Sequence, residues 1–255
     1  MSKPYLSVII PSYNELKNIR QNVLDEVYDY LKKQPYTWEI VCSDDGSTDG
    51  TVEQLHQFAK RDPSKIRVLE NLHRGKAPTI YSGMMSATGE NRLFTDFDQA
   101  TPLEEVELLF PYVKDGYDIV FGSREIAGSK REKEPFYRHL MGKVWNIFVQ
   151  TLAVPGISDT QCGFKLFTEK AAITLFPAMV IYKPSENERT TAFTGAFDVE
   201  LLYIARKYGF TYKEVPVQWH HVQTNRVNPI RDSLIMLFDL VKIRTADILG
   251  KYKRV

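Results

Sequence analysis

The stretch LSVIIPSYNE, residues 6–15, decides the expected fold, because an apolar run changes there abruptly into polar and turn-forming residues. Short apolar runs bounded by turn residues are typical of buried strands in a parallel sheet. Five such runs are present in the first half, at residues 6–10, 38–43, 66–70, 92–95 and 118–122. Helix-like segments lie between them, at residues 15–33, 49–61, 77–87 and 102–113. This alternation predicts βαβ units, and therefore an open, mostly parallel α/β sheet flanked by helices.

The second half of the chain has a different pattern. A polar loop runs to residue 134, an amphipathic helix is expected at 137–152, and residues 177–197 have the composition of a loop or lid. From residue 234 onward, apolar residues are interspersed with basic ones. That segment predicts either a helix packed on the core or a helix lying at a membrane interface. We expect a single domain over residues 1–255, with a mixed α/β second half beginning at residue 124.

Composition narrows the class of protein. With 255 residues, 43% hydrophobic and 25% charged, the chain is expected to be globular rather than disordered or coiled-coil. Cys42 and Cys162 stand far apart, which argues against a disulfide framework or a cysteine zinc site and fits a reducing compartment. No apolar stretch approaches the ~20 residues needed to cross a bilayer. Because Met1–Pro4 lead directly into a strand without a secretory leader, we expect a cytoplasmic protein.

The charge is distributed unevenly although the net charge is only +1. Residues 1–120 carry a net charge of −6 and the remaining residues a net charge of +7. A basic second half suits nucleic acid, phosphorylated ligands or an anionic membrane surface, and solvated surface charge produces the same pattern.

Three polar loops follow strands of the first half and carry the candidate site. They are Pro11–Glu15, Ser43–Thr51 and Asp96–Asp98. Ligands of open α/β sheets bind beyond the carboxyl ends of the strands, so the three loops are expected to converge on one edge. An aromatic ring in the first loop suits stacking on a nucleobase, although turn and cap chemistry explains the first two loops equally well. Carboxylates two residues apart in an extended segment point to the same side and suit Mg²⁺ or Mn²⁺.

Taken in order, Val8–Glu15, the DDGS loop at 44–47, Gly75-Lys76, Asp96-Phe97-Asp98 and Gly122-Ser123-Arg124 resemble the nucleotide-sugar-dependent glycosyltransferases of family 2. The resemblance implies the Rossmann-like fold called GT-A, with a nucleotide-sugar-binding half at 1–123 and an acceptor-binding half at 124–255. It implies Mg²⁺ or Mn²⁺ on Asp96 and Asp98. The residues that it places on the nucleotide sugar are Pro11, Tyr13, Glu15, Asp44, Asp45, Lys76, Asp96, Phe97 and Asp98.

A narrower likeness comes from the second half. SDTQCGFKLF at 158–167, FDVELL at 197–202, VPVQW at 215–219 and RDSL at 231–234 resemble the dolichyl-phosphate β-glucosyltransferases. This likeness implies UDP-glucose as donor, a polyprenyl (dolichyl or undecaprenyl) phosphate as acceptor, and a peripheral location on the cytoplasmic face of a membrane. Two departures stand out: Thr224–Val227 replaces the usual GSKL, and the N-terminal membrane helix of the eukaryotic enzymes has no counterpart in this sequence.

The expected reaction is attack of a lipid phosphate oxygen on the anomeric carbon, with inversion and departure of UDP. A phosphate monoester has a second pKa near about 6, so it needs little help from a general base at neutral pH. Charge control matters more, because a diphosphate leaves while another anion approaches. We assign Asp98 with Asp96 to the metal and the diphosphate, and Asp159 and Asp198 to the sugar, the acceptor or the metal surroundings. The arginines expected on phosphates are Arg124, Arg138 and Arg226.

Several alternatives remain open at this point. GDP-mannose as donor, or a soluble saccharide acceptor with Asp198 as base, fits the same family, and Asp198 also suits a helix cap. A non-catalytic binding module is a further class, although the acidic loops disfavour nucleic acid. Side chains with an unassigned second role are Lys130 and Arg131 near the lipid surface, His220 and His221 near phosphate or metal, and Trp145, Phe148 and Leu152 on a prenyl tail or in the core. The oligomeric state stays undetermined.

Overall fold

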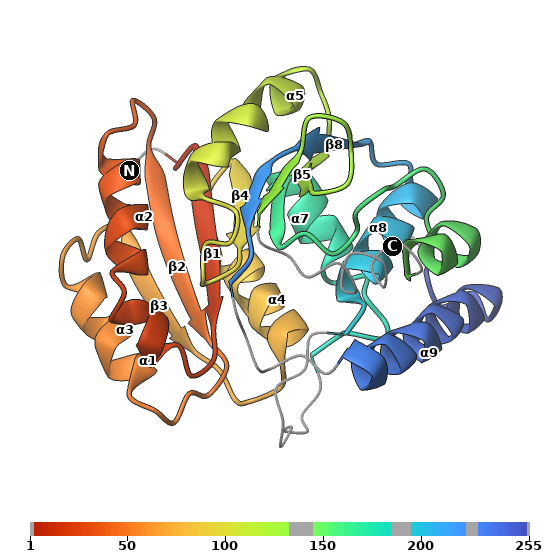
Figure 1. The fold of residues 1–255 in the computed structure, drawn as a ribbon, viewed down its shortest axis with the longest axis horizontal. Helices are drawn as coiled ribbons and strands as arrows, with labels where there is room; N and C mark the ends of the chain where they lie inside the picture. Colours follow the sequence, from red (N-terminus) through yellow and green to blue (C-terminus); the bar gives the residue numbers. More distant parts are fainter. Residues whose placement is uncertain (1–2, 133–144, 185–194, 223–228, 254–255) are drawn as a thin grey trace.

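The computed structural model describes residues 3–132, 145–184, 195–222 and 229–253, and its centre is a seven-stranded sheet (Figure 1). The strand order is β3-β2-β1-β4-β7-β5-β8. All of these strands run parallel except β7, which is antiparallel to both β4 and β5. The strands are β1 (Leu6–Ser12), β2 (Trp38–Asp44), β3 (Ile66–Glu70), β4 (Asn91–Thr95), β5 (Ile119–Ser123), β7 (Phe164–Thr168) and β8 (Tyr212–Pro216). The expected mostly parallel α/β fold is confirmed, and all five strands predicted in the first half are present within two residues of their expected ends.

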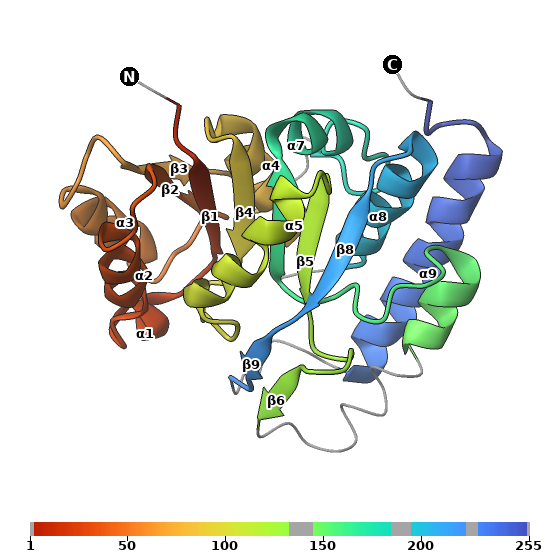
Figure 2. The ribbon, with the colours of Figure 1, turned by 90° about the horizontal axis from the view of Figure 1, so that it is seen from above.

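The helices cover both faces of the sheet (Figures 1 and 2). Ile9 and Phe94 point into one hydrophobic cluster with α4, α7, α8 and α9, whereas Val8, Ile10 and Leu93 point into a second with α2, α3 and α5. Burial on both faces explains why the strands are continuous apolar runs. The helices are α1 (Leu16–Ile19), α2 (Val23–Lys32), α3 (Thr51–Ala59), α4 (Lys76–Ser86), the 3-10 helix η1 (Leu103–Leu108), α5 (Phe110–Lys114), α7 (Glu169–Leu175), α8 (Phe197–Tyr208) and α9 (Pro229–Ile248), and residues 145–152 are also helical.

Two of the predicted helices are wrong as single elements. The helix expected over 15–33 is broken into α1 and α2, because Asn22 adopts a left-handed conformation with φ 64°. The helix expected over 102–113 is divided into η1 and α5, where Pro111 has no backbone N–H to continue a helical ladder.

The second half adds a small sheet that the sequence analysis does not predict. Strand β6 (Lys130–Glu132) pairs in parallel with β9 (Gln218–His220) where only a polar loop was expected. Of the segment expected as a loop or lid, residues 185–194 lie outside the described residues, and the segment ends where α8 begins at Phe197. Within the described residues, no helix combines the length and apolar character that a membrane span requires.

The position of β7 matters most for the site. Its insertion between β4 and β5 pairs Thr95, the last residue of β4, with Phe164, the first residue of β7. The loop that follows β4 and the loop that precedes β7 therefore meet at the carboxyl edge of the sheet. The N-terminal and C-terminal halves of the chain both contribute to this edge.

Candidate functional site

The loops after β1 and β2 are tied to each other. Their strands end in register, with Ser12 opposite Asp44. Asn14 has φ 53°, its backbone N–H donates to Ser47 Oγ at 2.8 Å, and its Oδ1 accepts from the N–H of Thr48 at 2.8 Å. Asn14 is therefore not the cap of the following helix. It joins the two loops that carry the first two predicted motifs.

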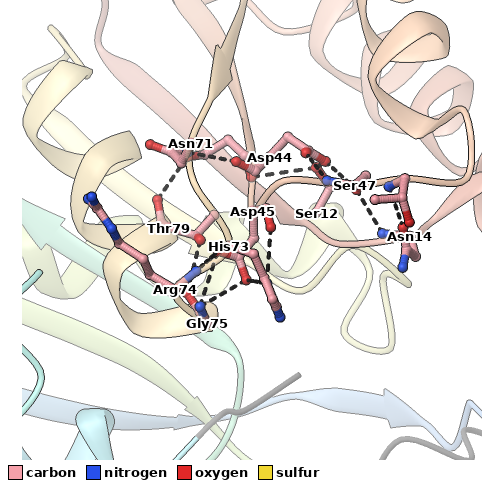
Figure 3. Close-up of polar contacts among 12 residues, drawn as sticks. Ser12, Asn14, Asp44, Asp45, Ser47, Asn71, His73, Arg74, Gly75 and Thr79 are labelled. Atoms are coloured by element: carbon pink, nitrogen blue, oxygen red, sulfur yellow. Dashed lines mark hydrogen bonds and ion pairs between the residues drawn. The ribbon is translucent and has the colours of Figure 1, made fainter. Parts of the chain in front are cut away.

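Asp44 is fully buried and its carboxylate is occupied by protein donors (Figure 3). It accepts from Ser12 Oγ at 2.8 Å, from the Ser47 backbone N–H at 2.7 Å and from Ser47 Oγ at 2.6 Å. Asn71 Nδ2 donates to its backbone carbonyl at 2.8 Å. These bonds fix the shape of the loop, and the predicted contact between this carboxylate and the nucleotide has to compete with them.

Asp45 holds the loop that leads into α4 (Figure 3). Its carboxylate accepts from the backbone N–H of Arg74 at 2.8 Å and of Gly75 at 3.0 Å, and it lies 2.9 Å from His73 Nδ1. Gly75 has φ 96°, a backbone conformation that residues with a side chain rarely adopt. The ring of His73 stacks on that of Tyr13, with centroids 4.1 Å apart and planes within 6°. Asp45 therefore sets the position of the ring that faces Tyr13.

Asp96 is held from both halves of the chain. Lys76, the first residue of α4, forms an ion pair with its carboxylate. The backbone N–H of Asp96 donates to the carbonyl of Gly163 at 3.0 Å. A Cβ atom on Gly163 would lie 2.0 Å from Asp96 Oδ2, so a larger residue there would displace the carboxylate. The glycine of the DTQCGF run has a steric role that the sequence analysis does not identify.

Asp98 has a perturbed ionisation. Burial, together with the negative charge of Asp96, raises the pKa of Asp98 to about 6, and Glu15 acts in the same direction. Lys76 and a hydrogen bond from the Ala100 N–H at 3.1 Å oppose this shift. The two aspartates do not lie in an extended segment as expected. They lie in a turn in which the N–H of Gln99 donates to the Asp96 carbonyl, yet their charges still interact.

Asp198 and Lys165 form a buried ion pair next to these carboxylates. Lys165 Nζ lies 2.6 Å from Asp198 Oδ1, and Lys165 also donates to the Cys162 carbonyl. Burial raises the pKa of Asp198, whereas Lys165 and Lys76 lower it. Asp198 is not a helix cap, because α8 is capped at Ala196. Lys165 belongs to the quoted DTQCGFKLF run, but the sequence analysis gives it no role.

Arg124 and Asp159 form a second, adjoining pair. The Asp159 carboxylate accepts from Arg124 Nε at 2.7 Å, from Arg124 Nη2 at 2.9 Å and from the Arg124 backbone N–H at 3.0 Å. Arg124 holds the pKa of Asp159 well below its usual range, and Lys165 contributes in the same direction. The guanidinium carbon also lies 5.4 Å from the centroid of the Trp219 ring. The two predicted catalytic residues are therefore brought together, bound to each other.

The other predicted residues are placed as follows. Pro11 is buried within β1, Glu15 is buried and accepts a hydrogen bond from Asn18 Nδ2 at 2.5 Å, and the side chain of Phe97 is part of the hydrophobic core.

Arg131 forms an ion pair with Glu125. The His220 backbone N–H donates to Ala100, and the His221 ring lies 5.7 Å from that of Trp219. Trp145 and Leu152 pack against the core and Phe148 is exposed. Arg138 and Arg226 lie outside the described residues.

The donor set fits a divalent cation shared with a substrate. Across the described ranges, no three His, Cys, Asp or Glu side chains gather into a complete metal site. Mg²⁺ is commonly bound by one or two carboxylates together with substrate phosphates. Asp96 and Asp98 are two hard oxygen donors suited to such an ion, and burial, together with the negative charge of Asp96, raises the pKa of Asp98.

Comparisons with known proteins agree with this geometry. The family model described as "Glycosyl transferase family 2" matches residues 7–176. The chain is 34% identical to the dolichyl-phosphate beta-glucosyltransferase of Dictyostelium discoideum, covering 98% of this chain and 76% of that protein. It is 34% identical to the Homo sapiens protein of the same name, covering 97% and 77%.

Solved structures share the arrangement of strands and helices. Glucosyl-3-phosphoglycerate synthase from Mycobacterium tuberculosis, solved with Mn²⁺, uridine diphosphate and glucosyl-3-phosphoglycerate, superposes with a TM-score of 0.62 at 14% identity. The alignment covers 98% of this chain and 80% of that one. Mannosyl-3-phosphoglycerate synthase from Rubrobacter xylanophilus gives a TM-score of 0.63 at 15% identity, covering 99% and 77%. At these identities the likeness concerns the fold.

Proposed function

Because the chain belongs to glycosyl transferase family 2 and has the GT-A fold, we propose that it transfers glucose from UDP-glucose to a polyprenyl phosphate. The observation that carries the proposal is the cluster at the carboxyl edge of the sheet. There, Asp96, Asp98 and Asp198 lie within electrostatic reach of Lys76 and Lys165. The similarity to proteins named dolichyl-phosphate beta-glucosyltransferase over nearly the whole chain supports this choice of sugar and acceptor.

In the proposed reaction, a phosphate oxygen of the lipid attacks the anomeric carbon of glucose. A new bond forms between that oxygen and the carbon, the bond to the UDP oxygen breaks, and the configuration inverts. The acceptor phosphate is already ionised at neutral pH, so no side chain has to remove a proton. The protein's task is to place two anions close together, and the lysines and arginines at this edge offset their repulsion.

We assign the donor to residues of the first half. The ring of Tyr13 contacts the nucleobase, with His73 and the Asp45 loop shaping that contact. Asp96 and Asp98 hold Mg²⁺ or Mn²⁺, which when bound offsets the charge of the leaving diphosphate. Lys76 keeps Asp96 oriented toward this position. The proposed nucleotide-sugar half is residues 1–123, with Pro11, Glu15, Asp44 and Phe97 shaping it from within the fold.

We assign the acceptor and the sugar to residues 124–255. Asp198 faces the cluster from α8, where it can accept hydrogen bonds from sugar hydroxyls, and the charge of Lys165 opposes the effect of burial on its pKa. Arg124, held by Asp159, contributes positive charge for the acceptor phosphate, and Arg138 and Arg226 belong to the same proposal. Because a polyprenyl phosphate resides in a bilayer, the protein is proposed to act as a peripheral protein on the cytoplasmic face of a membrane.

The proposal is tested by a transfer assay with radiolabelled nucleotide sugars. Purified protein, Mg²⁺ or Mn²⁺ and a polyprenyl phosphate in detergent are incubated with UDP-glucose or GDP-mannose, and label is counted after extraction into organic solvent. We expect label from UDP-glucose, lost in Asp98→Asn and kept in Asp115→Asn, an exposed carboxylate away from the edge. Label from GDP-mannose alone would overturn the choice of donor, and no extracted label from either would overturn the acceptor.

A hydroxyl acceptor is the second candidate, favoured by the burial that raises the pKa of Asp198. A sugar hydroxyl needs a base to remove its proton, and a carboxylate of raised pKa is suited to that task. The two candidates differ in the effect of Asp198→Asn. With a phosphate acceptor, the variant is expected to keep the pH dependence of the rate while turning over more slowly, whereas with a hydroxyl acceptor the acidic limb of that dependence is lost.

A further inference from the structure

Helix α9 has two unlike faces. Leu240, Ile243 and Ala246 are buried in the core. On the opposite face, Leu234 is 54% exposed, Phe238 66%, Val241 53% and Ile248 80%, and Leu249 directly after the helix is 64% exposed. Steps of four, three and seven residues return to the same side of an α-helix. Leu234, Phe238, Val241 and Ile248 therefore lie along one outward face, with the exposed Thr245 between the last two, and together with Leu249 they are called here the outer stripe.

Positive charges border the outer stripe. With about 100° of rotation per residue, Lys242 lies on one side of Val241 and Arg244 on the other, and both residues are exposed. The acidic residues of this part of the helix face inward. Asp239 is buried, accepts a hydrogen bond from Tyr182 and pairs with Lys242, whose side chain is still 59% exposed. Asp247 accepts hydrogen bonds from Tyr203 and Lys207. Between residues 234 and 253, the outward face carries cations and no carboxylate.

The helix of residues 145–152 also exposes apolar side chains. Ile147 is 65% exposed and Phe148 42%, whereas Trp145 and Leu152 pack against the core. Figures 1 and 2 both show this green helix lying alongside α9. Two neighbouring helices thus present large apolar side chains outward, which is unusual for a surface with no binding role.

Polar contacts fix α9 to the helix that carries Asp198. Arg244 Nη1 donates to Tyr203 Oη of α8 at 2.8 Å, and Tyr252 Oη donates to Glu200 at 2.7 Å. Figure 1 shows the first turns of α9 on the same lower side of the molecule as the arrowheads of β1 and β2. Whatever binds the outer stripe is therefore held in a fixed orientation relative to the reacting groups.

We propose that the outer stripe, with Ile147 and Phe148, docks the protein on an anionic lipid bilayer, the apolar side chains entering the headgroup region and the bordering cations meeting lipid phosphates. The inference rests on the proposed function, which places the acceptor in a bilayer. The charges favour lipid over a second copy of the chain. A two-fold contact through the stripe would bring Lys242, Arg244, Lys251 and Lys253 of both copies together, whereas the two carboxylates of residues 234–253, Asp239 and Asp247, are already paired within each copy with Lys242 and Lys207.

The test is flotation of purified protein with vesicles of phosphatidylcholine mixed with phosphatidylglycerol, compared with vesicles of phosphatidylcholine alone. Loss of two large apolar side chains in Phe238→Ser with Ile248→Ser is expected to weaken partitioning at least about tenfold. The matched control is Ile173→Ser on α7, which is 51% exposed and lies outside the stripe. It is expected to float as the wild type does.

A second pair of variants isolates the charges. Lys242→Gln with Lys251→Gln is expected to weaken partitioning several-fold on the anionic vesicles and to leave binding to phosphatidylcholine unchanged. Lys60→Gln with Lys114→Gln removes two exposed lysines elsewhere and serves as its control. Equal effects of the two pairs would show that net charge, rather than this surface, governs binding.

Two outcomes overturn the docking proposal. The first is a wild-type protein that stays with the unbound fraction, or stripe variants that float as well as it does. The second is a dimer in sedimentation that Phe238→Ser converts to a monomer, which would make the stripe an interface between copies. Transfer to a short-chain polyprenyl phosphate free in solution is measured in parallel. If the wild type does not transfer sugar to this soluble acceptor, the result counts against the proposed function. If a stripe variant that no longer floats still transfers sugar to it, docking is separate from catalysis.

Discussion

One acidic loop follows β2 and carries Asp44 and Asp45, and a second follows β4 and carries Asp96 and Asp98. The carboxylates of these two loops have different partners. Those of Asp44 and Asp45 are filled by hydroxyl and backbone donors, which fold the loops after β1, β2 and β3. Asp96 is instead held by Lys76, and Asp98 has its pKa raised to about 6 by burial and by Asp96. Position at a strand end is therefore insufficient to assign a role. The partners of a carboxylate distinguish one that builds a loop from one that we propose binds a ligand.

The sharpest test of this difference is Asp98→Asn. The amide keeps the size of the side chain but removes the charge proposed to hold a cation and the leaving diphosphate, so we expect kcat to fall by about a thousandfold. Asp44→Asn is the matched change in the other loop and is expected to lower the melting temperature more than the turnover of the folded enzyme. Initial rates and thermal unfolding of both variants measure the contrast. Equal loss of turnover in the two would remove it.

A second test concerns the buried ion pair between Lys165 and Asp198. The Lys165→Met variant keeps a long side chain but removes its positive charge. Asp198 then has no cation beside it inside the protein, which is expected to cost about 3 kcal/mol of unfolding free energy. Urea unfolding monitored by tryptophan fluorescence measures this loss. Adding Asp198→Asn to the same variant removes the unpaired charge and is expected to restore most of the stability. A double variant as unstable as the single one would show that packing around Lys165, rather than charge, is responsible.

A third test weakens the loop-building carboxylate itself. Ser47→Ala removes one of the donors to Asp44, and a buried carboxylate left short of a partner costs about 2 kcal/mol. Ser64→Ala is the control, since Ser64 donates to Asp62 in an exposed turn. Chemical unfolding of the two variants gives the comparison. An unchanged midpoint for Ser47→Ala would mean that Ser12 and the backbone bonds hold the Asp44 loop without the Ser47 hydroxyl.

The sequence predicts the fold more fully than the site, for physical reasons. Apolar runs report burial on both faces, so the strands of the parallel sheet are legible, and the polar residues after them mark the functional edge. Pairings are not legible in this way. Nothing local indicates that Lys165 faces Asp198 or that Gly163 leaves room for Asp96, because both pairings depend on β7 entering the sheet between β4 and β5. Nor does the sequence indicate that His73 stacks on Tyr13, because that contact joins the loops after β3 and β1, which β2 separates.

The same limit applies to the helices. The interruption at Asn22 depends on a single left-handed residue that leaves the amphipathic pattern intact. For α9, the sequence allows either a core helix or an interfacial one. In the structure, Leu240 and Ile243 of this helix are buried in the core, whereas Phe238 and Val241 are exposed. The sequence shows that basic and apolar residues are interspersed in this helix, but only the packing of the helix shows which apolar residues are exposed.

The smallest expected effect separates the two loops by their response to pH. Since burial and the charge of Asp96 raise the pKa of Asp98 from 3.8 to about 6 on folding, the folded protein binds a proton here that the unfolded chain releases. Stability from this group is present below the unfolded pKa and is lost as the pH rises through about 6. Asp98→Asn lacks this loss. From pH 5 to pH 8, its unfolding free energy is therefore expected to rise by about 1 kcal/mol relative to that of the wild type. Unfolding of both proteins at several pH values, without divalent cations, measures the difference, with Asp115→Asn as an exposed control. Parallel curves for wild type and Asp98→Asn would mean that Asp98 titrates normally, and the two loops would then differ in their partners but not in their charge.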